Sequence, residues 1–154
     1  IYAQIHSNLK DGPCRVFAAP TDVRLSAVHA AETEDDEPTV LQPDLLVGCR
    51  NELFTERGVA GAPELIVEIT SPESGYSDRK RKFDLYERYG VREYWIVDPD
   101  ERVVEVYLLE SDNRFRRAGI YGSTDTVTGT AVGGVEVDLQ EVFPARHTDA
   151  NEPR

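Results

Sequence analysis

Short strand-like segments separated by turns dominate this chain, and that pattern limits the folds open to it. From Arg102 to Leu109 apolar residues recur at every second position, which is the period of a half-buried strand. Residues 64–69, Glu-Leu-Ile-Val-Glu-Ile, are typical of a buried strand. The same kind of pattern predicts strands over residues 14–18, 21–25, 40–47, 91–97, 114–120 and 136–139.

Two helical segments accompany these strands. The longer one is expected from Ser77 to about Tyr89, with Ser77 or Asp78 as its cap and Gly90 at its end. Residues 1–10 have the apolar spacing of the last turns of a helix. The order of helix, strands, central helix and further strands predicts an α+β fold, in which a mixed sheet carries a packed helix.

The length of 154 residues fits one domain, which we expect over residues 1–146 with a polar tail over 147–154. The chain contains no methionine and begins with Ile1, so we expect the natural N-terminus and part of the first helix to be missing. Residues 31–38 hold five acids and no base, which favours a solvated hairpin loop, and residues 48–62 are expected to form a polar loop.

The charge balance excludes some classes of partner. A formal net charge of −12 repels phosphate backbones, so a protein that coats DNA or RNA without a metal is not expected. No apolar run approaches the roughly 20 residues that cross a bilayer, so we expect no membrane association. Cys14 and Cys49 are too few for a disulfide scaffold, and we interpret them as ordinary thiols of a cytoplasmic protein.

Two carboxylates interrupt the predicted apolar strands. Asp44 lies beside a leucine-rich segment, and Glu68 lies between Val67 and Ile69. A solvent-facing position is the ordinary interpretation of one such acid, but two of them, 24 positions apart with one loop between, suit adjacent strands of a hairpin. Two hard oxygen donors at one end of a sheet predict an Mg²⁺ or Mn²⁺ site.

The helix that follows Glu68 adds a lysine and a basic surface. Asp78, Lys82 and Tyr86 recur at every fourth position and therefore share a face, although Asp78 and Lys82 also make an ordinary helical ion pair. Lys82 is the candidate that orients water or stabilises charge on a phosphate. The run Arg79-Lys80-Arg81-Lys82 is the densest positive stretch, and we predict that it contacts a nucleic-acid backbone. Trp95 is expected in the core or at a dimer contact.

Four segments together resemble one protein family. They are residues 42–47 (Gln-Pro-Asp-Leu-Leu-Val), residues 64–74 around Glu68, residues 78–86 of the basic helix, and residues 89–99 (Tyr-Gly-Val-Arg-Glu-Tyr-Trp-Ile-Val-Asp-Pro). They resemble the Uma2 family, restriction-endonuclease-like proteins of the PD-(D/E)XK nuclease superfamily. The resemblance runs from about residue 3 to residue 144 and is densest between 42 and 107.

The resemblance implies a restriction-endonuclease-like core and a metal-dependent endonuclease acting on DNA. Asp44 and Glu68 match the two acids of the superfamily pattern, and the backbone carbonyl of Ile69 matches a further metal contact. The pattern places lysine two residues after the second acid, where this chain has Thr70. The family takes its lysine from the following helix, which points to Lys82.

The remaining site residues follow from the same resemblance. Lys80 is a second candidate for the lysine, although it lies about 200° from Lys82 around a helix. Asp78 orients Lys82 or metal-bound water, and a glutamate that many such nucleases carry on their first helix falls in the part we expect to be missing. The expected reaction is attack of water on a phosphate held by one or two Mg²⁺ (or Mn²⁺) ions.

Two other functions stay open from the sequence. A catalytically inert module that keeps the nuclease fold, as a homodimer, is favoured by the acidity of the chain and by the lack of a recognised DNA-reading element. A weaker alternative uses the same metal site on another phosphate ester.

Overall fold

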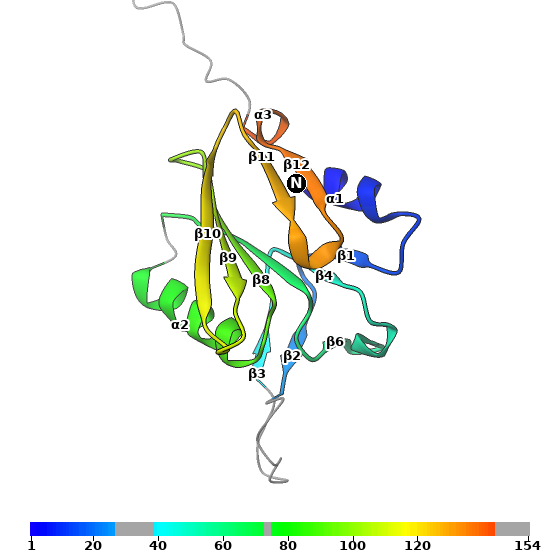
Figure 1. The fold of residues 1–154 in the computed structure, drawn as a ribbon. Coiled ribbons are helices and arrows are strands. Elements are labelled where there is room, and N and C mark those ends of the chain that lie inside the picture. The colour runs from blue at the N-terminus through cyan, green and yellow to red at the C-terminus, as the bar shows by residue number, and fades with distance from the viewer. Residues whose placement is uncertain (27–38, 73–74, 144–154) are drawn as a thin grey trace, which may run out of the picture.

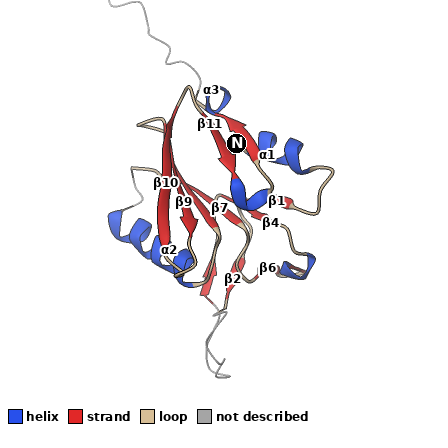
Figure 2. Ribbon diagram, viewed as in Figure 1, coloured by secondary structure: helices blue, strands red, loops and turns tan. Residues whose placement is uncertain are grey.

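A six-stranded sheet forms the centre of the protein (Figures 1 and 2). The computed structural model describes residues 1–26, 39–72 and 75–143. The sheet order is β1 (Arg15–Ala18), β4 (Leu45–Gly48), β7 (Leu65–Ile69), β8 (Glu93–Asp98), β9 (Val103–Leu109) and β10 (Phe115–Gly122). β7 and β8 run parallel and the other neighbours run antiparallel, so the predicted mixed sheet is confirmed.

Both faces of this sheet are covered. Alternate residues of β4 and β7 point to opposite faces, so that Leu46 and Ile66 lie on one face while Val47 and Leu65 lie on the other. α2 (Tyr76–Arg88) packs on the first face, and α1 (Tyr2–Leu9), α3 (Leu139–Val142) and the hairpin of β11 (Thr126–Gly129) and β12 (Val135–Asp138) pack on the second (Figure 1). Burial on both faces explains why these strands are continuous apolar runs.

The segment predicted as one strand over residues 40–47 is two strands in different sheets. β3 (Thr39–Leu41) joins a four-stranded sheet of order β3-β2-β6-β5, and β4 joins the six-stranded sheet. Pro43 lies between them and has no N–H for a ladder, so the chain leaves one sheet there and enters the next.

The expected polar loop over residues 48–62 is also wrong. It contains the 3₁₀ turn Asn51–Leu53 and a hairpin of β5 (Phe54–Thr55) and β6 (Gly58–Ala60), and β6 pairs parallel with β2 (Val23–Leu25). Gly58 makes this hairpin possible, since its φ is +108° and a Cβ there would lie 2.4 Å from the carbonyl oxygen of Asp22. Strands this short leave too few residues for a periodic pattern to be recognised.

The other boundaries differ by a few residues. α2 begins one residue earlier than predicted, and its N-cap is Gly75 rather than Ser77 or Asp78, while Gly90 follows its end with φ +85°. β11 was not predicted. Residues 31–38 of the expected acidic loop and the expected tail over 147–154 lie outside the described residues. None of the helices in the described part of the chain is long and apolar enough to cross a membrane.

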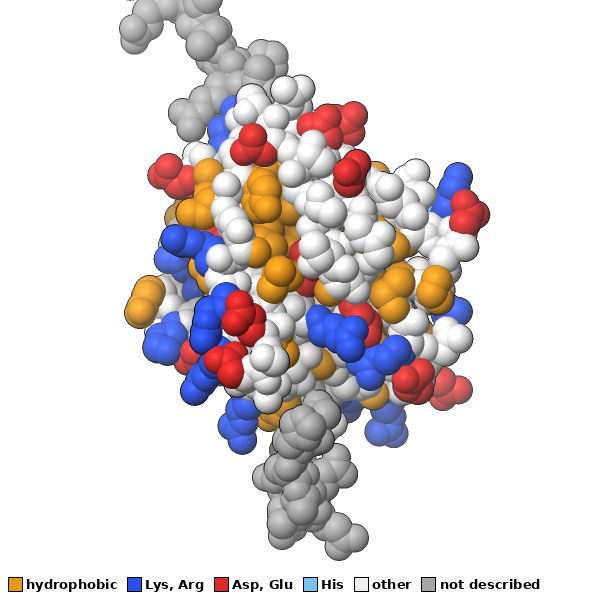
Figure 3. Space-filling model, viewed as in Figure 1, with side chains coloured by type: hydrophobic (Ala, Val, Ile, Leu, Met, Phe, Trp, Pro, Cys, Tyr) orange, Lys and Arg blue, Asp and Glu red, His pale blue; other side chains and the backbone are white. Residues whose placement is uncertain are grey.

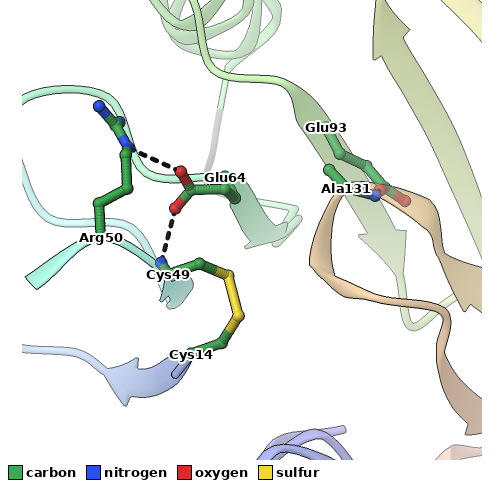
Figure 4. Close-up of a disulfide and its surroundings, with 6 residues drawn as sticks. All are labelled: Cys14, Cys49, Arg50, Glu64, Glu93 and Ala131. Carbon is green, nitrogen blue, oxygen red and sulfur yellow. Dashed lines mark hydrogen bonds and ion pairs between the residues drawn. A yellow bond between two sulfur atoms is a disulfide. The ribbon is translucent and has the colours of Figure 1, made fainter. Parts of the chain in front are cut away.

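Cys14 and Cys49 form a disulfide, which corrects their interpretation as separate thiols (Figure 4). β1 and β4 pair with Arg15 opposite Gly48, and the next pair in this register is Cys14 and Cys49. Beside the disulfide, the buried carboxylate of Glu64 accepts hydrogen bonds from the Cys49 N–H at 2.7 Å and the Arg50 guanidinium at 2.9 Å (Figure 4). The cysteine count therefore no longer supports a reducing compartment, and a cytoplasmic location remains only a prediction from sequence.

Candidate active site

Asp44 and Glu68 meet at one end of the β4–β7 pair. The antiparallel register sets Leu45 opposite Val67, and its continuation sets Asp44 opposite Glu68. The Oδ2 atom of Asp44 accepts a hydrogen bond from the backbone N–H of Ile69 at 2.7 Å, which fixes this carboxylate beside Glu68. Both acids lie on the sheet face that α2 covers, because they share the alternation of Leu46 and Ile66.

α2 brings two donors to Glu68. The ammonium of Lys82 lies 2.8 Å from Oε2 of Glu68, and the hydroxyl of Tyr86 donates to Oε1 at 2.7 Å. Asp78 lies one turn before Lys82, with 3.9 Å between its carboxylate and the ammonium. The face predicted from the spacing of Asp78, Lys82 and Tyr86 is therefore the face of α2 that meets the acids.

Burial governs the protonation of this cluster. Glu68 is 7% exposed, and this burial raises the pKa of its carboxyl above the ordinary value. The hydrogen bonds from Lys82 and Tyr86 and the charge of Lys82 lower this pKa, but they do not bring it back to the ordinary value. The charge of Asp44 raises the pKa further. Burial, followed by the charge of Glu68, also raises the pKa of the Tyr86 hydroxyl, which therefore stays protonated and acts as a donor.

The rest of the basic run points away from the acids. Lys80 is exposed and pairs with Asp84 at 2.8 Å, Arg81 lies 3.9 Å from Asp78, and Arg79 is exposed. A helix places residues two positions apart on nearly opposite sides, so Lys82 alone of this run reaches Glu68. The structure thus separates the two lysine candidates and leaves Arg79, Lys80 and Arg81 on the surface.

The donor set of the site suits a hard divalent cation. Glu68 and Asp78 lie beside the Lys82 ammonium, and Asp44 lies opposite Glu68 on the next strand, so the cluster has more negative than positive charge. Within residues 1–26, 39–72 and 75–143, no group of three or more His, Cys, Asp or Glu side chains is arranged as a metal cage. Mg²⁺ is commonly held by one or two carboxylates with water and substrate phosphate, and Asp44 with Glu68 fits that requirement.

Ile69 contributes in a way that the sequence did not predict. Its backbone N–H holds Asp44, and the expected role of its carbonyl as a metal ligand stays a prediction. Sequence reasoning also missed the strand residues that flank the acids: Ile96 of β8 pairs with Glu68, and Glu105 of β9 pairs with Ile96. The helical spacing from Tyr76 to Phe83 was the available signal for a second face of α2 above them.

A family model shows the family of the chain, and a solved structure shares its fold. A family model described as Uma2, putative restriction endonuclease, matches residues 1–140. The chain is similar in structure to a protein titled as a putative nuclease belonging to DUF820 from Anabaena variabilis ATCC 29413, with a TM-score of 0.67 and 18% identity. The match covers 92% of this chain and 75% of that one. None of the curated proteins matches the chain.

Proposed function

We propose, from the premise that the chain belongs to the Uma2 family of putative restriction endonucleases, that it is a metal-dependent endonuclease that hydrolyses phosphodiester bonds of DNA. The observation that carries this proposal is the cluster of Asp44, Glu68 and Lys82 at one end of the sheet. The cluster lies beside a strand end, with Glu68 buried and with Asp44 and Lys82 half-buried. Two acids and a lysine in this setting suit phosphoryl chemistry better than a purely structural role.

Asp44, Glu68 and the carbonyl of Ile69 are the groups proposed to hold Mg²⁺ or Mn²⁺. Asp44 uses one carboxylate oxygen to bind the Ile69 N–H, which leaves the other for the ion, and each oxygen of Glu68 has a further lone pair beyond its one donor. A divalent ion in such a site polarises the phosphate and makes bound water more acidic.

Lys82 and Tyr86 keep the Glu68 carboxylate ready for this role. Their hydrogen bonds favour the ionised form, which opposes the effect of burial. The Lys82 ammonium has three N–H groups and donates one to Glu68, so among the described residues the other two are available to orient water or stabilise charge on a phosphate oxygen. Asp78 acts as a positioning residue for Lys82.

DNA reaches an acidic protein through a local basic surface. Figure 3 shows Lys and Arg side chains gathered with Asp and Glu side chains at the lower left, where α2 lies in Figure 1. Arg79, Lys80 and Arg81 on the exposed side of α2 are the residues proposed to contact the DNA backbone.

The test is a cleavage assay paired with a metal-binding measurement. Plasmid and single-stranded DNA are incubated with Mg²⁺ or Mn²⁺, and calorimetry measures binding of each ion. We expect Asp44→Asn and Glu68→Gln to lose metal binding and cleavage, and Lys82→Ala to keep metal binding while cleavage falls by about 100-fold or more. Glu136→Gln and Lys10→Ala, exposed substitutions of the same kinds on the other side of the sheet, serve as matched controls.

Two results would overturn the proposal. Cleavage that persists in both Asp44→Asn and Glu68→Gln shows that these acids do not form the active site. A wild-type protein that binds neither ion and cuts neither DNA favours the inert module, and a dimer in light scattering then supports its homodimeric form.

A further inference from the structure

A groove lies between the first half of α2 and the strands β8 and β9. Its volume is about 420 Å³, and the residues that decide its chemistry are Tyr76, Arg79, Lys80, Phe83, Ile96 and Glu105. The helical residues among them follow the three- and four-residue spacing of one face. This face is adjacent to the face of Asp78, Lys82 and Tyr86, so the groove and the candidate active site lie along neighbouring faces of α2.

The groove is one strand away from Glu68. Ile96 in its floor pairs with Glu68 across the parallel β7–β8 ladder, and Glu105 pairs with Ile96 across β8–β9. Adjacent strands lie about 4.8 Å apart, so Ile96 and Glu105 lie about 5 and 10 Å from Glu68, and about 10 and 14 Å from Asp44. This separation is within the length of one or two nucleotides of a strand whose phosphate is bound at Asp44 and Glu68.

The lining provides stacking surface, positive charge and hydrogen-bond acceptors. Tyr76 is 75% exposed at the start of α2, although burial of an aromatic ring is energetically favourable. Phe83 and Ile96 add further apolar surface to the groove. Arg79 and Lys80 lie on the helix beside the ring and can hold a phosphate. Exposed aromatic rings with neighbouring cations are the usual platform for unpaired bases.

The acids of the groove select which part of a nucleotide enters. Asp84 also lines the groove. Glu105 uses Oε2 for Tyr107 and Arg117, and Asp84 uses Oδ2 for Lys80, so within the described residues the second oxygen of each is available as an acceptor. Carboxylates repel a phosphate but accept hydrogen bonds from the exocyclic amine of cytosine. Stacking on Tyr76 needs an uncovered base face, which the neighbouring base pairs cover in a duplex, so the occupant is an unpaired base.

We propose that this groove binds one unpaired base of single-stranded DNA, preferentially cytosine over thymine, with Tyr76 stacking on the base and Glu105 accepting from its amine. The proposal rests on the proposed function, since it places the base next to the phosphate at Asp44 and Glu68. It specifies the substrate class as single-stranded DNA or an unpaired segment within a duplex.

The test measures binding of labelled oligonucleotides by fluorescence anisotropy, with Ca²⁺ as an oxygen-seeking ion. The probes are oligo-dC, oligo-dT, an oligo-dC with one abasic position, and a duplex. We expect oligo-dC to bind more tightly than the other three. Tyr76→Ala weakens binding of oligo-dC by about 5- to 100-fold, Tyr76→Phe retains it, and Glu105→Gln reduces the preference for dC over dT. Tyr2→Ala, which removes an exposed tyrosine from α1, is the matched control and has no effect.

The same variants in the cleavage assay separate this proposal from the proposed function. Loss of oligo-dC binding in Tyr76→Ala, with no cleavage by any form, supports the groove and removes the nuclease assignment. If cleavage depends on Asp44 but Tyr76→Ala changes neither binding nor cleavage, the groove is not a base-binding site and the nuclease function is retained. Equal binding of dC, dT and duplex overturns the groove in either case.

Discussion

Tyr86→Phe tests whether Glu68 is a buried, hydrogen-bonded carboxylate. Tyr86 is fully buried on α2, and its hydroxyl donates to Oε1 of Glu68 at 2.7 Å. Phenylalanine fills nearly the same volume, so the substitution removes one hydrogen bond to a charged acceptor and little packing. Hydrogen bonds to charged groups contribute about 1.5–3 kcal/mol, and we expect a loss of that size in the free energy of unfolding at pH 8. For a chain of this length the melting temperature then falls by about 3–12 °C.

The dependence on pH gives the prediction its sign. The Tyr86 hydrogen bond lowers the pKa of Glu68, so its removal raises the folded-state pKa further above the ordinary value of 4.5. The loss is therefore largest above the folded-state pKa. It shrinks to that of a neutral hydrogen bond, about 0.5–1.5 kcal/mol, once the pH is below 4.5 and the carboxyl is protonated in both states.

Urea unfolding followed by circular dichroism measures the free energy of unfolding of both forms from pH 8 to pH 4. The samples contain EDTA and micromolar protein. Tyr107→Phe is the matched control, because the Tyr107 hydroxyl donates at 2.8 Å to Glu105, a half-exposed carboxylate. That pair is open to water, and we expect it to contribute less than about 1 kcal/mol. Destabilisation by Tyr86→Phe that is equal at pH 8 and pH 4, or no larger than that of Tyr107→Phe, would refute the reasoning.

Two further predictions concern the opposite face of the sheet. Reduction of the Cys14–Cys49 disulfide opens a loop closed over a separation of 35 residues, and we expect the free energy of unfolding to fall by about 4 kcal/mol. Urea unfolding with and without a thiol reductant measures this change, and an unchanged unfolding midpoint contradicts the prediction. Glu93 is fully buried and accepts hydrogen bonds from the Trp95 indole and the Ala131 N–H at 2.7 Å each. Glu93→Ala leaves these buried donors unpaired, and we expect it to lower the free energy of unfolding by about 3 kcal/mol or more in the same assay. A loss below about 1 kcal/mol would show that the donors find other partners.

Much of the candidate site follows from local patterns. Asp44 and Glu68 stand out because each interrupts an apolar segment, and a buried charge needs a partner. The positions of Lys82 and Tyr86 follow from helical spacing, which repeats within a few residues whatever the surrounding fold. Whether these residues bind a metal or cut DNA stays a prediction, because neither property is expressed in spacing or geometry alone.

The sequence by itself determined the α+β class, the main strands, α2 and the face of α2 that carries Lys82, because these depend on periodicities of two and 3.6 residues. The spacing of Asp44 and Glu68 also predicted that their strands, β4 and β7, are neighbours. Only the tertiary structure decided that Pro43 separates two sheets and that Cys14 meets Cys49. It also decided that Ile96 and Glu105 lie beneath α2 as the floor of a groove. These features depend on which strands pair and in which register, and pairing between distant segments is set by the whole packed core rather than by any short stretch of residues.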